Sequence, residues 1–260
     1  MKKNKMMRLA SAMMVLTLMS TSVISGTFAK YVTTASGTDT ARVAKWGVEV
    51  TSTSDLFANT YATDNGDVKT TIENSVVAGE AGGELVAPGT TKKDVAFTIK
   101  GTPEVAVKVE VKIDEINKDA GVKDVVLKTG TYTDYTKVIG YDASGNPTYG
   151  TFELTEDYYP LVWTLKNGTE QVATGKLSDI KTYLESTLSK NYEANTDLSK
   201  IGVTTASGQY ELSWTWEFEQ GKDAADTLLG NIAAGTATVD NAQYCLDVAY
   251  TLSITVTQID

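Results

Sequence analysis

Carboxylates, a single cysteine and a set of aromatic side chains are the groups in this sequence that could do chemistry, and histidine is absent. Histidine is the commonest general base and zinc ligand, so Ser-His-Asp, Cys-His and His-Glu-x-x-His sites are excluded. The glycines form neither a phosphate-binding loop nor a dinucleotide fingerprint. We therefore expect a protein that is not an enzyme, with no catalytic residue, no cofactor and no bound metal ion.

Two acidic patterns leave alternatives open. Glu217 and Glu219 lie on one face of a predicted strand, and paired carboxylates can hydrolyse glycosides. Acids on the polar face of a strand are more often solvated surface. Asp64, Asn65 and Asp67 resemble part of a calcium loop without its full spacing, so a surface turn is the favoured interpretation.

Aromatic side chains and the cysteine complete the inventory. Trp214, Trp216 and Phe218 could stack against sugars, but their alternation predicts the core of a sandwich instead. The Tyr-rich segments TYTDYTKVIGYDASGNPTYG and EDYYPLVW are better candidates for a contact surface. Cys245 is predicted to be a buried thiol, with an intermolecular disulfide as the alternative.

The N-terminus predicts a secretory signal peptide over residues 1–29. Basic MKKNKMMR is followed by the mostly apolar LASAMMVLTLMSTSVI, and Thr27 and Ala29 are small residues at −3 and −1 of a cut before Lys30. The alternative is a retained anchor, but sixteen helical residues span only about 24 Å of a ~30 Å hydrocarbon core. Removing the leader leaves 19 basic and 33 acidic side chains, a net charge of −14. Such a surface repels nucleic acid and anionic lipid.

The rest of the chain alternates with period two and predicts one all-β domain over residues 30–260, an antiparallel β-sandwich. Residues 30–40 are expected to form a flexible arm, and a strand is expected from Ala41. The side chains predicted to face inward are Ala44, Trp46, Val48 and Val50; Val95, Phe97 and Ile99; Val105, Val107, Val109, Val111 and Ile113; Tyr210, Leu212, Trp214, Trp216 and Phe218; and Leu246, Val248, Tyr250, Leu252, Ile254 and Val256.

Four local signals interrupt these strands. Pro88-Gly89 predicts a type II turn, and Ser144–Pro147 predicts the turn of a hairpin. LSDIKTYLESTLSK predicts an amphipathic helix with Leu177, Ile180, Leu184 and Leu188 inward and Ser178 as its cap. GKDAADTLLGN predicts a second, short helix that starts near Asp223 and ends near Gly230.

Both ends of the chain resemble the TasA/camelysin family of Firmicutes. GTFAKY, Gly26–Tyr31, is similar to the site at which a SipW-type signal peptidase cuts in that family. VAPGTTKKDVAFTIKG resembles the family's Pro-Gly turn and long strand, and YTLSITVTQID resembles its last strand. Residues 121–195 do not align with the family. Metalloprotease activity described for camelysin relatives does not carry over to a chain without histidine.

The resemblance implies a jelly-roll-like fold, secretion and assembly into the fibres of a biofilm matrix. The implied partners are a second copy joined head to tail, the signal peptidase, and other matrix or cell-surface components. An open sheet edge can accept an extended peptide, and a head-to-tail contact that does not close makes filaments. The segment expected to be donated contains Tyr31, Val43, Trp46, Val48 and Val50. The alternatives are a monomeric cell-surface adhesion or glycan-binding module and, more remotely, a carboxylate hydrolase.

Overall fold

The computed structural model describes residues 42–52, 56–65, 70–79, 83–114, 123–203, 208–218 and 221–259. The chain divides after Lys45, and Trp46–Asp260 forms one compact unit. The predicted signal peptide, Thr27, Ala29 and Lys30 at its cleavage site, the arm and Tyr31 all lie outside the described residues, so these predictions stay predictions. No helix among the described residues is long and apolar enough to span a membrane.

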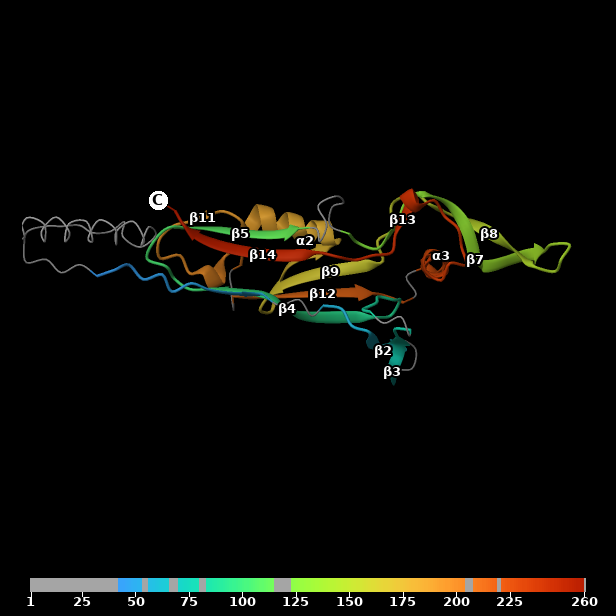
Figure 1. Ribbon diagram of the computed structural model, residues 1–260, viewed down its shortest axis with the longest axis horizontal. Helices are drawn as coiled ribbons and strands as arrows, with labels where there is room; N and C mark the ends of the chain where they lie inside the picture. The colour runs from blue at the N-terminus through green and yellow to red at the C-terminus, as the bar shows by residue number, and fades with distance from the viewer. Residues whose placement is uncertain are drawn as a thin grey trace, which may run out of the picture. The chain divides into compact units, whose positions relative to one another are not determined.

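Two antiparallel sheets form the layers of the unit (Figure 1). The five-stranded sheet has the order β1 (Glu49–Ser52), β4 (Thr91–Lys100), β12 (Gln209–Trp216), β9 (Leu161–Asn167) and β10 (Glu170–Gly175). The three-stranded sheet has the order β11 (Asn191–Tyr192), β5 (Val107–Asp114) and β14 (Thr251–Gln258). The all-β, antiparallel prediction is confirmed, whereas the jelly-roll connectivity stays a prediction.

Smaller elements complete the unit. Strands pair as β2 (Thr60–Asn65) with β3 (Thr70–Val77), β6 (Val126–Leu127) with β13 (Tyr244–Cys245), and β7 (Gly130–Tyr141) with β8 (Pro147–Leu154). The helical segments are α2 (Leu177–Tyr183) with a π-helical turn (Leu184–Leu188), α3 (Asp223–Ala233), and 3-10 turns at Leu198–Lys200 and Asn241–Gln243. The predicted hairpin and both predicted helices are therefore present.

The core follows the period-two pattern. The five inward side chains predicted around β5 are all buried, because alternate residues of a strand point to the same face. Tyr210 stacks on Phe97 with ring centroids 4.4 Å apart, which joins β12 to β4. The indole N–H of Trp214 donates to the Leu56 carbonyl at 2.6 Å, so this buried polar group is satisfied. Trp214 and Trp216 are thus core residues, as predicted.

Helix α2 and the π-helical turn that follows it bury the four apolar side chains that the sequence predicts. The predicted cap is wrong, however. The helix begins at Leu177, one residue before Ser178, and the Asp179 carboxylate accepts the N–H of Lys176 at 2.9 Å. An acid in the first turn therefore satisfies the N–H of the residue before the helix, and the helix dipole favours its negative charge.

Three strand boundaries differ from the prediction. The N-terminal strand starts at Glu49 instead of Ala41, because Gly47 takes a left-handed φ of +51° that interrupts the extended chain. Strand β12 ends at Trp216, and Phe218 is exposed beside Gly89, whose φ of +81° fits the predicted type II turn. The last strand starts at Thr251, after the Leu246–Tyr250 segment that was expected to begin it.

Candidate functional site

Strand β1 is the point where the N-terminal segment enters the five-stranded sheet. It pairs with β4 through four residues only, from Glu49 opposite Lys100 to Ser52 opposite Phe97. All four side chains are exposed. A strand held by one neighbour and burying almost no side chain contributes little stability, since burial of apolar surface is the main favourable term in folding. Strand β1 is therefore the least anchored strand of its sheet.

Two glycines fix the approach to β1. Gly101, just after β4, has a φ of +126°, and Gly47 precedes β1. A Cβ at Gly101 would lie 2.1 Å from the carbonyl oxygen of Gly47. The two backbones can approach this closely only because Gly101 lacks a side chain.

Strand β14 is the matching edge of the three-stranded sheet. It pairs with β5 along its whole length, and no strand among the described residues pairs with its other side. Its inward residues Leu252, Ile254 and Val256 are only half-buried. Sheet edges are commonly protected by charges, prolines or bulges, and Thr251–Gln258 contains no charge and no proline. Strand β14 is thus an unprotected edge with a partly uncovered apolar row.

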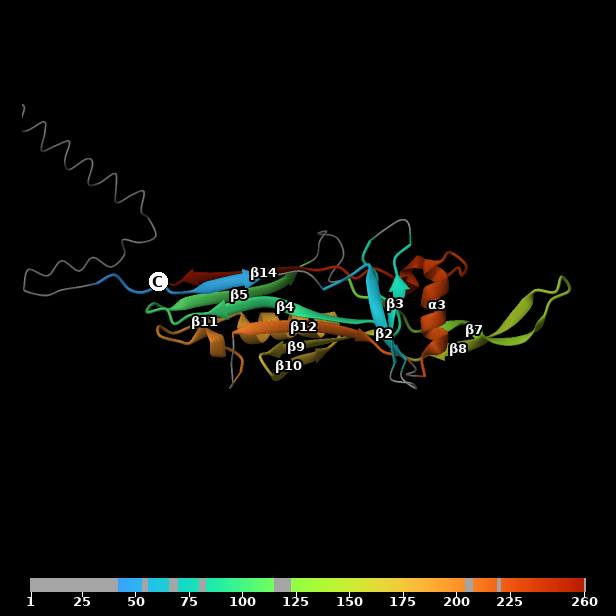
Figure 2. The same cartoon turned by 90° about the horizontal axis from the view of Figure 1, so that it is seen from below.

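The edges of the two sheets meet at one side of the sandwich. Figure 2 shows β1, in blue, running beside β14, and Cα atoms of the two strands come within 8 Å without pairing. Strand β1 therefore lies between β4, with which it pairs, and β14, with which it does not. We call this position the edge slot.

The described residues that were predicted to take part in assembly lie along the segment that leads into β1 and within β1 itself. Val43 is 81% exposed in the segment before Lys45. Trp46 is exposed and Val48 is half-buried in the irregular approach to β1, and Val50 is exposed within β1. The prediction that Trp46 and Val50 face inward is therefore wrong, because β1 lies at the edge of its sheet with all four of its side chains exposed.

The acidic candidates do not form a catalytic or metal site among the described residues. Glu217 is exposed just beyond β12, and Glu219 lies outside the described residues. Asp64 and Asn65 fall in β2, and Asp67 lies outside the described residues. In the described part of the chain no three His, Cys, Asp or Glu side chains gather as metal ligands would. Cys245 is half-buried on β13, and its thiol lies 3.4 Å from the Asp247 carbonyl.

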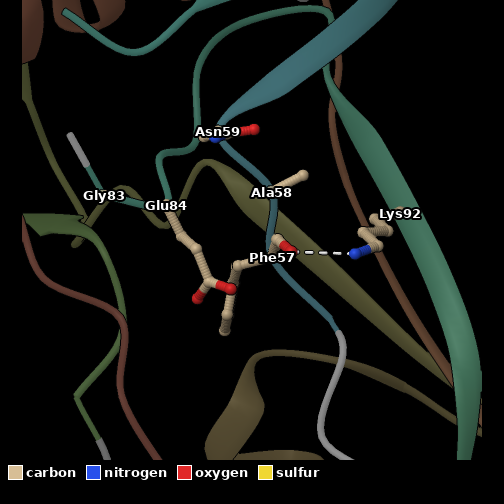
Figure 3. A pocket seen from close by; sticks show the side chains of 6 residues that line it. All are labelled: Phe57, Ala58, Asn59, Gly83, Glu84 and Lys92. Carbon is tan, nitrogen blue, oxygen red and sulfur yellow. Dashed lines mark hydrogen bonds between the residues drawn. The ribbon is translucent and has the colours of Figure 1, made fainter. Parts of the chain in front are cut away.

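A polar hollow of about 390 Å³ lies between the segment before β2 and strand β4 (Figure 3). Its lining residues are Phe57, Ala58, Asn59, Gly83, Glu84 and Lys92. The Lys92 ammonium donates to the Phe57 carbonyl at 2.8 Å, and the Phe57 ring stacks on buried Trp214 with centroids 5.9 Å apart. The lining offers one carboxylate, Glu84, and no second acid or nucleophile for it to work with. The hollow therefore carries no catalytic arrangement.

Sequence reasoning missed a buried carboxylate. Asp124 accepts the indole N–H of Trp163 at 3.4 Å and the Leu177 N–H at 3.1 Å, which ties β9 to the first residue of α2. Burial raises the pKa of Asp124 to about 6, against the lowering effect of these hydrogen bonds. Both carboxylate oxygens are used by the fold, so Asp124 is a structural residue.

A second acid, half-buried Asp226, lies in the first turn of α3. The Asp226 carboxylate accepts the Tyr158 hydroxyl at 2.7 Å and the Trp216 indole N–H at 3.1 Å. Burial raises the pKa of both Asp226 and Tyr158. The segment EDYYPLVW, expected to offer a contact surface, thus uses one of its tyrosines internally.

Comparison with known proteins gives no relative. No protein-family model matches the chain, and neither the curated proteins nor the solved structures contain a match.

Proposed function

We propose that this protein is a secreted, non-enzymatic structural subunit that assembles head to tail into extracellular matrix fibres. Each copy would donate the N-terminal segment exposed by removal of the leader, Lys30–Val50, to the edge slot of the next copy. The observation that carries the proposal is that this segment enters the fold through a short, fully exposed edge strand beside an unprotected second edge.

The edge slot supports strand exchange better than simple addition. Strand β1 already occupies it, through only four paired residues whose side chains are all exposed. A second copy's segment can replace β1 and form the same backbone hydrogen bonds to β4, so exchange costs little in the slot itself. The segment from Tyr31 adds length to the four residues that pair within one copy, and this added pairing would favour the assembled state.

Charge supports the same pairing. The chain carries a net charge of −10, yet Lys30–Val50 contains three basic side chains and two acidic ones, and β14 contains no charge. Two copies of an acidic protein repel each other over most of their surfaces. A slightly basic segment and an uncharged edge are therefore a route by which copies can join.

The test compares chains that start at Lys30 and at Trp46. Both retain β1, but only the first carries the segment before it. We expect filaments by electron microscopy from the Lys30 chain alone, and a Lys30 chain whose residues 30–45 are shuffled controls for length and composition. Equal polymerisation of the Lys30 and Trp46 chains would contradict donation through this segment.

A second candidate, a monomeric cell-surface adhesion or glycan-binding module, is favoured by one observation. Tyr141 is exposed on the β7–β8 hairpin, and aromatic rings are a common surface for sugars. A mature chain that stays monomeric at high concentration and binds a glycan array would support this function over the first.

A further inference from the structure

The β7–β8 hairpin consists of two unlike halves. In the half nearest the sandwich, Tyr132 is buried and donates its hydroxyl to the Lys128 carbonyl at 2.7 Å. The register then shifts, since Asp134 pairs with Gly150 and Val138 pairs with the neighbouring Tyr149. Bulges of this kind bend a strand and redirect its side chains. We call residues 135–149, beyond this irregularity, the distal ribbon.

The distal ribbon exposes apolar side chains in an ordered setting. Ile139 is 63% exposed and Tyr141 is 73% exposed, with exposed Val138 beside them. Its turn is fixed from within, because the Asp142 carboxylate accepts the N–H groups of Ser144 and Asn146, both at 2.8 Å. The same hydrogen bonds hold the pKa of Asp142 below its usual value. The apolar surface therefore belongs to a well-formed ribbon.

Such a ribbon is incomplete by itself. A lone pair of strands is marginally stable in water and needs a third strand or a packed face. The two strands of this ribbon pair only with each other among the described residues. Within the distal ribbon β8 carries Pro147, whereas β7 carries no proline and one charged side chain, Lys137, so the β7 edge is the less protected against pairing.

The exposed side chains of the distal ribbon favour a second copy of this chain over a sugar as its binding partner. Beside the aromatic rings, the exposed side chains Val138 and Ile139 are aliphatic, and they can neither stack on a sugar ring nor bond its hydroxyls. The ribbon also carries one positive charge, Lys137, and one negative charge, Asp142, on a chain whose net charge is −10. It is therefore a neutral surface on an acidic protein, and its two charges complement those of an identical ribbon that runs in the opposite direction.

We propose that the distal ribbon pairs antiparallel with the distal ribbon of a second copy, in a two-fold contact centred near Ile139. Pairing creates a four-stranded sheet and brings the aliphatic side chains of the two copies beside each other across the new strand pair. This contact is separate from the edge slot and closes on itself. In a head-to-tail fibre it would join one fibre to its neighbour.

Directed cross-linking tests this contact in the full-length chain. Cys245→Ser removes the only thiol while keeping a donor for the Asp247 carbonyl, and Ile139→Cys is then added. We expect a disulfide-linked dimer at micromolar concentration under mild oxidation. The matched control is Val77→Cys in the same background, on another strand and 58% exposed, which should remain mostly monomeric. Equal cross-linking by the two variants, or none by Ile139→Cys, would overturn the proposal.

Charge variants distinguish pairing of the distal ribbon with a second copy from its binding to another kind of partner. Ile139→Lys and Ile139→Asp should each be monomeric by sedimentation velocity, because like charges meet at the two-fold axis. An equimolar mixture should recover at least tenfold more dimer than either variant alone. A mixture that gains no dimer, or a monomeric wild-type chain that loses retention on polysaccharide when Ile139 is changed, would overturn the two-fold contact. The edge slot is unchanged in all these variants, so their failure leaves the head-to-tail proposal standing.

Discussion

At the scale of single residues, Asp124 shows how a carboxylate can be structural and still couple the fold to pH. Its pKa of about 6 lies above the ordinary value of 3.8, so folding favours its protonated form. Its contribution to the free energy of unfolding is therefore full below about pH 4 and is lost as the pH rises through about 6. The corresponding change in the free energy of unfolding is roughly 3 kcal/mol.

Asp124→Asn isolates this effect, because the amide is similar in size and does not titrate. Urea unfolding of both proteins between pH 4 and pH 8 should show the wild type losing roughly 3 kcal/mol relative to the variant as the pH rises. A difference in the free energy of unfolding that does not change with pH would show that Asp124 does not titrate in this range.

Gly101 is the second residue with a defined physical requirement. Gly101→Ala combines a left-handed φ with a clash against the Gly47 carbonyl, so we expect a loss of about 1–3 kcal/mol in the free energy of unfolding. Hydrogen exchange of the β1 amides should also become faster. Gly145→Ala is the matched control, because Gly145 has a φ of +83° but no atom within 4 Å of an added Cβ. If both variants lose β1 protection equally, the Gly47–Gly101 contact does not hold β1.

At the scale of elements, the spacing of apolar residues in the sequence predicts which side chains face inward. The inward faces of β5 and β12 and the apolar face of α2 follow directly from residue spacing. The first residues of the edge strands β1 and β14 do not follow from residue spacing, because backbone geometry and neighbouring elements set where these strands begin. The left-handed φ of Gly47 and the exposure of Phe218 arise from such tertiary packing.

The same limit applies to the candidate site. The resemblance of GTFAKY to a signal-peptide junction predicts the N-terminal segment as the working part, but its acceptor cannot be found from residue spacing. Strand β14 lies about 200 residues from β1 in sequence, and the two approach only in the folded sandwich. Asp124 was missed for the same reason, since its partners Trp163 and Leu177 are 39 and 53 residues away.

At the scale of the whole molecule, the two proposed contacts differ in symmetry. Exchange through the edge slot is head to tail and extends without limit, whereas pairing of the distal ribbons is two-fold and closes. A subunit with both contacts would form fibres that join side by side. Removing the distal ribbon should then leave single filaments, and removing the N-terminal segment should leave dimers.

The most direct test of the edge slot asks whether β1 pairs with its own β4 or with that of a neighbour. Glu49 lies directly opposite Lys100, at a separation that suits a disulfide. In the Cys245→Ser background, Glu49→Cys and Lys100→Cys are made in separate chains that start at Lys30, then mixed, assembled and oxidised. The account predicts a covalent heterodimer that links Glu49→Cys of one copy to Lys100→Cys of another. If the mixture forms filaments without this link, while one chain carrying both cysteines closes only on itself, then β1 stays in its own sheet and strand exchange at the edge slot is contradicted.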